Sequence, residues 1–156
     1  MTTIAWDGIT LAADSQADNG GLIMPVSKLY RGQMDDGTPF IFGGAGDLSQ
    51  CVELFSWIKT LTAKNCRITP FPKYQANTFE PSCVVVVAGL GAHILAGSII
   101  NPVMRRFHAC GSGRDYAMMA MHLGKSALEA VGLACEFDTF SGGNVSSMIL
   151  DTWGKG

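Results

Sequence analysis

The sequence predicts an α+β fold, in which antiparallel strands form the sheets and helices pack outside them. Short strand-like segments occur in pairs around tight-turn signals, at Asp7-Gly8 and again at Asp36-Gly37, which is typical of antiparallel hairpins. Segments with helical spacing of apolar residues follow, so that the order is strands, helix, strands, two helices, strand. The 156 residues are expected to form one domain, residues 1–156.

The first half of the chain is expected to hold two hairpins and one helix. The predicted strands cover residues 2–6, 9–13, about 26–31 and 39–43. Residues 15–21 are predicted to be a turn region between the hairpins, because they are rich in Asp, Asn and Gly. Asp47 is a suitable N-cap for a helix over about 48–64. Residues 65–82 contain prolines without a clear period and are predicted to form a surface loop.

The second half is expected to hold three strands, two helices and a last strand. The three strands are predicted over residues 82–89, 93–99 and 102–110, and the last over 145–153. A helix is predicted from about 115, with Gly124 at its C-terminal end. Ser126 and Glu129 form a capping box for the next helix, which reaches to about Cys135.

The composition excludes several functions. The chain has 11 basic and 13 acidic residues without a basic stripe or polybasic run, so neither a nucleic acid nor a membrane is expected as a partner. Five cysteines without a C-x-x-C pair argue against disulfides and zinc, and favour reduced thiols in the cytoplasm. The low charge and the positive mean hydropathy indicate either self-association or a large core.

Three residues near the start of the chain can be combined into a nucleophilic site. If Met1 is removed, Thr2 supplies both a hydroxyl nucleophile and, through its free amine, the base that accepts the hydroxyl proton. Lys28 would keep that amine from being protonated, and Asp14 would hold Lys28 in place. The alternative is that a small residue simply follows Met1 and that the charged pair lies on the surface.

Two glycine-rich stretches precede predicted helices. The sequence GGAG over 43–46 and the sequence GSG over 111–113 place unpaired backbone N–H groups at strand-to-helix junctions. Such groups can hold an oxyanion, although a tight turn followed by a helix cap is the more common meaning of such a stretch.

Six motifs in order resemble the proteasome β-type and HslV-like peptidase subunits, in a compact form such as a bacterium or a phage would encode. They are TTIA, DGITLAADS, SKLYR, GGAGD, CGSGRDYA and DTFSGG. The resemblance implies a four-layer αββα sandwich of two antiparallel sheets, the N-terminal nucleophile hydrolase fold. It assigns the nucleophile to Thr2 and the oxyanion-hole N–H to Gly46. The supporting catalytic residues that it implies are Asp14, Lys28, Ser112, Asp138 and Ser141.

The resemblance also implies a pocket for the substrate side chain that precedes the cleaved bond. Carried onto this chain, the pocket residues are Ala17, Val26, Tyr30, Gly44, Leu48 and Val52. None of them is charged, so cleavage after large apolar residues is expected. Asp18 is close enough in sequence to reach into the pocket, and it would then favour Lys or Arg instead.

The resemblance therefore predicts a threonine endopeptidase that needs no cofactor. It allows a structural sodium or magnesium ion at the backbone carbonyls of Cys135, Asp138 and Ser141. The expected partners are further copies of the chain in a ring or double ring, peptide and protein substrates, and an ATP-dependent unfoldase. Two alternatives stay open at this point: an amidase of the same class that acts on a small amide, and a non-catalytic module that forms a ring.

Overall fold

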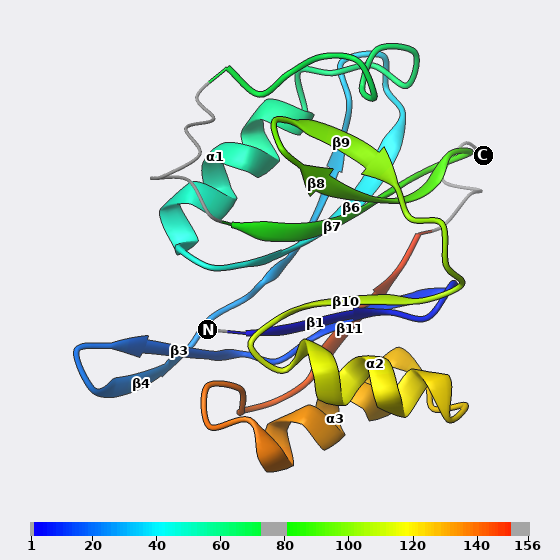
Figure 1. Cartoon of the computed structure of the whole chain (residues 1–156). Helices are drawn as coiled ribbons and strands as arrows, with labels where there is room; N and C mark the ends of the chain where they lie inside the picture. Colours follow the sequence, from blue (N-terminus) through cyan, green and yellow to red (C-terminus); the bar gives the residue numbers. More distant parts are fainter. Residues whose placement is uncertain (1, 73–80, 151–156) are drawn as a thin grey trace.

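The chain folds into two antiparallel sheets packed face to face, with helices on both outer faces (Figure 1). The computed structural model describes residues 2–72 and 81–150. The predicted order of strands, one helix, strands, two helices and a last strand is confirmed. The predicted α+β class is confirmed as well, together with the four layers that run helix, sheet, sheet and helix.

The first sheet has the N-terminal hairpin at its centre. Its strands, in spatial order, are β10 (His108–Gly111), β1 (Thr3–Trp6), β2 (Thr10–Ala13) and β11 (Ser146–Ile149). Helices α2 (Arg114–His122) and α3 (Ala127–Phe137) cover its outer face. Alanines at positions 5, 12 and 109 form the sheet side of this contact, so the helices can approach the strands closely. Strands from the last third of the chain thus flank β1 and β2 on both sides.

The second sheet has five strands and a single covering helix. The strands, in spatial order, are β5 (Leu29–Gln33), β6 (Pro39–Ala45), β7 (Ser82–Val87), β8 (Gly91–Ala96) and β9 (Ile99–Pro102), and the helix is α1 (Leu48–Ile58). Leu54 and Ile58 of α1 pack on Phe40 and Phe42 of the sheet. A second apolar cluster fills the space between the two sheets. Each large side chain that is fully buried there contributes about 1.5–3 kcal/mol to the stability of the fold.

The segment that was predicted as a turn region over residues 15–21 is instead half of a two-stranded hairpin. Strands β3 (Gln16–Asn19) and β4 (Leu22–Pro25) pair with each other and project from the body of the molecule (Figure 1). Gly20 and Gly21 both have positive φ, +61° and +89°, which is the requirement of a two-residue type I′ turn. The Asn-Gly-Gly sequence was therefore the signal of a hairpin with a tight turn rather than of a long irregular connection.

Two further boundaries differ from the prediction. Helix α1 ends at Ile58 rather than near 64, because Thr62 and Asn65 bond to nearby backbone groups and so compete with further helix. The single strand predicted over 93–99 is the two-strand hairpin of β8 and β9, which turns at Gly97 with φ +65°. Of the strand predicted over 102–110, residues 108–110 lie in β10 and residue 102 ends β9, while 103–107 are outside the sheets.

The predicted starts of α1 and α3 and the predicted end of α2 are confirmed by their contacts. The Asp47 carboxylate accepts a hydrogen bond from the Gln50 N–H, and Ser126 forms the capping box with Glu129. Gly124 follows α2 with φ +95°. Among the described residues, no helix is both long and apolar enough to cross a bilayer. Met1, part of the predicted loop at 65–82 and the end of the predicted strand at 145–153 lie outside the described residues.

Candidate active site

Thr2 lies directly before β1, where the two sheets open on one side of the molecule. Its side chain is almost fully covered by the protein, yet Thr2 lines two separate cavities. The end of β10 fixes the position of Thr2. Gly111, the last residue of β10, has φ +95°, and a Cβ on Gly111 would stand 1.9 Å from the Thr2 carbonyl oxygen. Only glycine therefore allows the end of β10 to approach Thr2 this closely.

A buried ion pair lies on one side of Thr2. The Lys28 ammonium donates to Asp14 Oδ1 at 2.9 Å and to the Gln16 carbonyl at 2.5 Å. Asp14 is fully buried, and Lys28 is exposed by only 5%. The Asp14 carboxylate also accepts from the backbone N–H groups of Thr3 (3.0 Å) and Gly142 (3.0 Å), so its orientation is set by three segments of the chain. The predicted pairing of Asp14 with Lys28 is present in the structure.

Burial changes the acidity of Lys28. Removal from water lowers the pKa of the ammonium, and the hydrogen bond and charge of Asp14 offset this only in part, so that the pKa lies below its ordinary value. A lysine with a lowered pKa beside a cleft is a frequent feature of catalytic sites. The burial of the Lys28–Asp14 pair and its hydrogen bonds to several backbone groups distinguish it from an ordinary ion pair on the surface.

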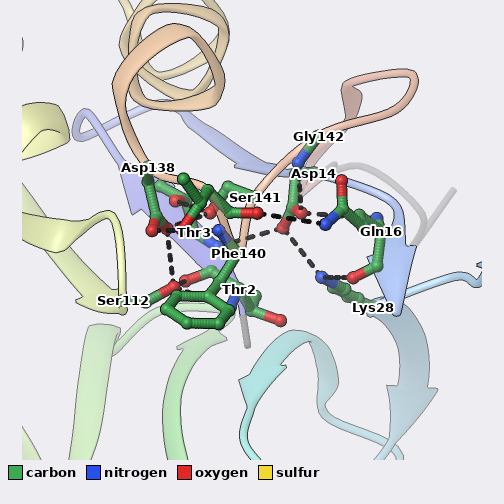
Figure 2. A network of polar contacts seen from close by, with 11 residues as sticks. Thr2, Thr3, Asp14, Gln16, Lys28, Ser112, Asp138, Phe140, Ser141 and Gly142 are labelled. Carbon is green, nitrogen blue, oxygen red and sulfur yellow. Dashed lines mark hydrogen bonds and ion pairs between the residues drawn. The ribbon is translucent and has the colours of Figure 1, made fainter. Parts of the chain in front are cut away.

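A chain of hydroxyl groups lies on the other side of Thr2 (Figure 2). Thr2 N lies 3.2 Å from Ser112 Oγ, and the Ser112 hydroxyl donates to Asp138 Oδ2 at 2.6 Å. Ser141 donates to the same carboxylate oxygen at 2.6 Å, and Thr3 Oγ1 lies 2.7 Å from Ser141 Oγ. Because Ser141 uses its proton on Asp138, the Thr3 hydroxyl donates to Ser141. The structure thus brings together the predicted residues Ser112, Asp138 and Ser141.

The hydroxyl chain also determines the charge of Asp138. Burial raises the pKa of this carboxyl, but the hydrogen bonds from Ser112 and Ser141 and from the Phe140 N–H outweigh burial and lower it. Asp138 is therefore an anion near neutral pH and acts as the final acceptor of the chain that begins at Thr2 N. Such a chain can move or hold a proton at that nitrogen.

Gly46 faces the same space as Thr2. It follows β6 with φ +115°, a left-handed conformation that favours glycine, and it lines both cavities beside Thr2. Within the described residues, no group accepts a hydrogen bond from the Gly46 N–H. A backbone N–H in this position can donate to a negatively charged oxygen that forms above Thr2.

The larger of the two cavities is a cleft of about 420 Å³ between the β3–β4 hairpin and α1. Five of the six predicted pocket residues line it, namely Ala17, Val26, Tyr30, Gly44 and Leu48. Val52, the sixth, does not, because its side chain is on an exposed part of α1. Cys51, one position earlier and three residues from Leu48, lines the cleft in its place. Burial raises the pKa of the Cys51 thiol to about 11, so this wall is uncharged.

Two carboxylates stand among the lining residues of the cleft, at Asp18 and Asp47. Asp18 accepts from the Gly21 N–H at the tip of the hairpin, at 2.8 Å. Asp47 accepts from the N–H of Gln50 and from the Ser49 hydroxyl at the start of α1. Each carboxylate is thus held by hydrogen bonds within its own element, the β3–β4 hairpin or the start of α1. The remaining side chains that line the cleft are mostly apolar or uncharged.

Several residues of the site carry no signal in the sequence. Thr3, Gln16 and Gly142 bind the ion pair or the hydroxyl chain, in part through backbone groups that any residue possesses. Over residues 2–72 and 81–150, no group of three or more His, Cys, Asp or Glu side chains is placed to hold a metal. The Asp138 carbonyl accepts from the Ser141 N–H at 3.2 Å. The predicted cation at the carbonyls of residues 135, 138 and 141 stays a prediction.

The two sheets with their helical covers are the N-terminal nucleophile hydrolase fold, which solved structures share over nearly the whole chain. Thiobacillus denitrificans BPH is 20% identical, with 97% of each chain covered and a TM-score of 0.67. The same protein in complex with epoxomicin gives 17% identity, 97% of this chain, 98% of that chain and a TM-score of 0.67. Eukaryotic HslV from Trypanosoma brucei is 22% identical, with 96% of this chain and 98% of that chain covered and a TM-score of 0.65.

No family model matches the sequence, and no curated protein matches it either. The likeness is therefore one of architecture: the chain shares its fold with Thiobacillus denitrificans BPH and with HslV from Trypanosoma brucei at a low level of sequence identity.

Proposed function

We propose that the protein is a threonine-type endopeptidase whose nucleophile is Thr2. The observation that carries the proposal is the convergence of three polar groups on one residue. Thr2 N lies on the chain through Ser112 to Asp138. Lys28, which is paired with Asp14, lines the cleft beside Thr2, and Gly46 lines it as well. The shared fold with HslV from Trypanosoma brucei supports the same function.

The reaction begins once the residue before Thr2 is removed and Thr2 N is an amine. Its reference pKa is about 7.7–8.0, so only about a tenth to a sixth of it is unprotonated at pH 7, and a neighbouring positive charge would raise that share. The amine accepts the proton of the Thr2 hydroxyl, and Thr2 Oγ attacks the peptide carbonyl. The Gly46 N–H stabilises the oxyanion that results. The leaving amine takes the proton, an ester remains on Thr2, and water hydrolyses this ester to regenerate the enzyme.

The surrounding residues tune the Thr2 amine. The Lys28 ammonium disfavours a second positive charge close by, which keeps the amine able to accept a proton. Ser112, whose own proton is directed to Asp138, presents its oxygen to Thr2 N and so orients that nitrogen. A cation at the loop after α3, sodium or magnesium, is not needed for any of these steps.

The processed protein is expected to cleave peptides after large apolar residues. The walls of the 420 Å³ cleft contain Met24, Val26, Tyr30 and a protonated Cys51 thiol, and a charged substrate side chain would lose hydration there. Each well-buried apolar side chain adds about 1.5–3 kcal/mol. Comparing kcat/KM for matched fluorogenic peptides that end in Leu, Arg and Glu measures this preference.

The same panel, tested alongside small amides, separates the proposal from its alternatives. Hydrolysis of small amides but of no peptide would favour an amidase on the same fold. Turnover of neither, in protein whose intact mass shows a free Thr2, would favour a non-catalytic assembly module. Inhibition of cleavage by epoxomicin is a second readout, because a protein of the same fold binds it. A preference for Arg would show that Asp18 or Asp47 controls the cleft.

The protein is also expected to self-associate, in a ring or double ring. Large apolar side chains are exposed at the hairpin tip and on the helices, including Leu22, Ile23, Met119, Leu123 and Phe137. Exposed apolar surface of this kind often marks an interface. Light scattering at micromolar concentration is expected to give a multiple of the chain mass, and a monomer mass would contradict the expectation. An ATP-dependent unfoldase would then deliver protein substrates to the enclosed sites.

A further inference from the structure

A second cavity, of about 200 Å³, lies on the other side of Thr2 from the large cleft. Its lining residues are Thr2, Ala45, Gly46, Ser82, Gly111, Ser112 and Arg114. Among the described residues, the two cavities have only Thr2 and Gly46 in common. These are the residues that, under the proposed function, supply the nucleophile and the oxyanion donor.

The shared residues fix how a peptide passes through the site. The substrate carbonyl that Thr2 attacks must lie between Thr2 and Gly46, and the substrate peptide must extend from that carbonyl in two directions. If the residue before the cleaved bond occupies the large cleft, the residue after it enters the second cavity. This step rests on the proposed function, because it needs Thr2 as the nucleophile.

Arg114 is the charged residue among the described side chains that line the second cavity. Its Nη1 donates to the Gly111 carbonyl at 3.2 Å, which holds the guanidinium beside the end of β10. Its Nε lies 3.8 Å from Asp115, an exposed contact in which water weakens the attraction. A guanidinium has five N–H donors in a planar fork, a geometry that suits a carboxylate.

The stability of α2 does not explain an arginine at this position. Arg114 is the first residue of α2, and the positive end of a helix dipole disfavours a cation there. The N-cap is Gly113, which forms no side-chain cap. Asp138, the carboxylate that Ser112 binds, already accepts hydrogen bonds from Ser112 and Ser141, and these two bonds favour its charged form without Arg114. The Arg114 side chain thus lines the cavity beside Thr2 and, at 61% exposure, is accessible to a ligand.

We propose that the second cavity binds the residue that follows the cleaved bond, and that Arg114 favours Asp or Glu at that position. The substrate carboxylate meets the guanidinium at the cavity mouth, while the Thr2 hydroxyl attacks the preceding carbonyl. Specificity is therefore divided between two sides of the nucleophile: an apolar residue before the bond and an acidic residue after it.

The test uses internally quenched peptides that are identical except for Glu, Gln or Lys directly after the cleaved bond. Their C-termini are amidated and distant, so that only the side chain supplies a carboxylate. Since Arg114 is partly exposed, kcat/KM is expected to be about two- to fivefold higher for Glu than for Gln, and lowest for Lys. The ratio between peptides is compared within each variant, so that a general change in activity cancels.

Three variants decide the outcome. Arg114→Gln is expected to abolish the preference for Glu over Gln, and Arg114→Glu to reverse the order so that Lys is best. Lys125→Gln removes an equal charge just past the opposite end of α2 and is expected to keep the wild-type ratios. Equal rates for Glu, Gln and Lys in the wild-type protein, or a preference that survives in Arg114→Gln, would overturn the inference. Absence of cleavage of every peptide would instead overturn the proposed function on which it rests.

Discussion

Replacing Thr2 by alanine is expected to abolish peptide cleavage while the protein stays folded. The change removes the hydroxyl that attacks the carbonyl in the proposed mechanism. The neighbouring hydroxyls of Ser112 and Ser141 are directed to Asp138, and that of Thr3 is bonded to Ser141. Loss of the nucleophile is expected to lower kcat by at least about 10³-fold. The loss is measured by kcat with the preferred peptide, alongside thermal unfolding to establish that the fold is intact.

Thr2→Ser is the matched control, since it keeps both the hydroxyl and the amine. It is expected to retain measurable cleavage, and intact mass must show that residue 2 is the first residue of both variants. If Thr2→Ala cleaves peptides at the wild-type rate, then Thr2 is not the nucleophile and the proposed mechanism is wrong.

Replacing Lys28 is expected to reduce kcat nearly as much. Lys28→Ala removes the charge that keeps the Thr2 amine unprotonated and leaves Asp14 buried without its counter-ion. Loss of one such electrostatic group costs about 10²–10³-fold in kcat. Removing one partner of a buried ion pair costs about 3–5 kcal/mol, and because backbone N–H groups still bind Asp14, the free energy of unfolding is expected to fall by an amount near the lower end of this range.

Lys28→Arg is expected not to restore activity. A guanidinium is larger and planar, and it cannot fill a space shaped for contacts of 2.9 Å to Asp14 and 2.5 Å to the Gln16 carbonyl. Lys59→Ala, which removes a lysine just after α1, is the control and should leave kcat unchanged. Full activity in Lys28→Arg would show that a diffuse positive charge is sufficient.

The state of Lys28 also limits the pH range of activity. Burial lowers the pKa of Lys28, so its ammonium loses its proton at a lower pH than an exposed lysine, whose pKa is 10.5. If the charged form is required, wild-type kcat/KM is expected to fall on the alkaline side before that value is reached.

Sequence signals were reliable where the physics is local. Asp47, Gly124 and Ser126 mark helix ends through bonds within four residues, and these ends lie where they were predicted. The β3–β4 hairpin was missed, although its Gly-Gly turn is also a local signal, because neither strand shows a clear apolar alternation: β4 is exposed along its whole length.

The candidate site was predictable in part. Asp14 and Lys28 could be assigned because their side chains carry the chemistry, whereas Ser112 and the Gly46 N–H were assigned through the resemblance. Gln16 and Gly142 contribute a backbone carbonyl and a backbone N–H, which the identity of a residue does not reveal. Cys51 and Val52 are consecutive residues of α1, so their side chains point in different directions around the helix axis. Which of the two faces the cleft depends on how α1 packs on the second sheet.

The central place of the β1–β2 hairpin in its sheet has a consequence for biosynthesis. The ribosome makes this hairpin first, but its neighbours β10 and β11 are made last, and Asp138 and Ser141 emerge only just before β11. For most of its synthesis, a growing chain therefore contains Thr2, the proposed nucleophile, but not yet Asp138 and Ser141. Contacts between such distant parts of a chain form slowly and late in folding. Under the proposed function, proteolytic competence would thus arise only at the end of folding, and an incomplete chain would not cleave the polypeptides made around it.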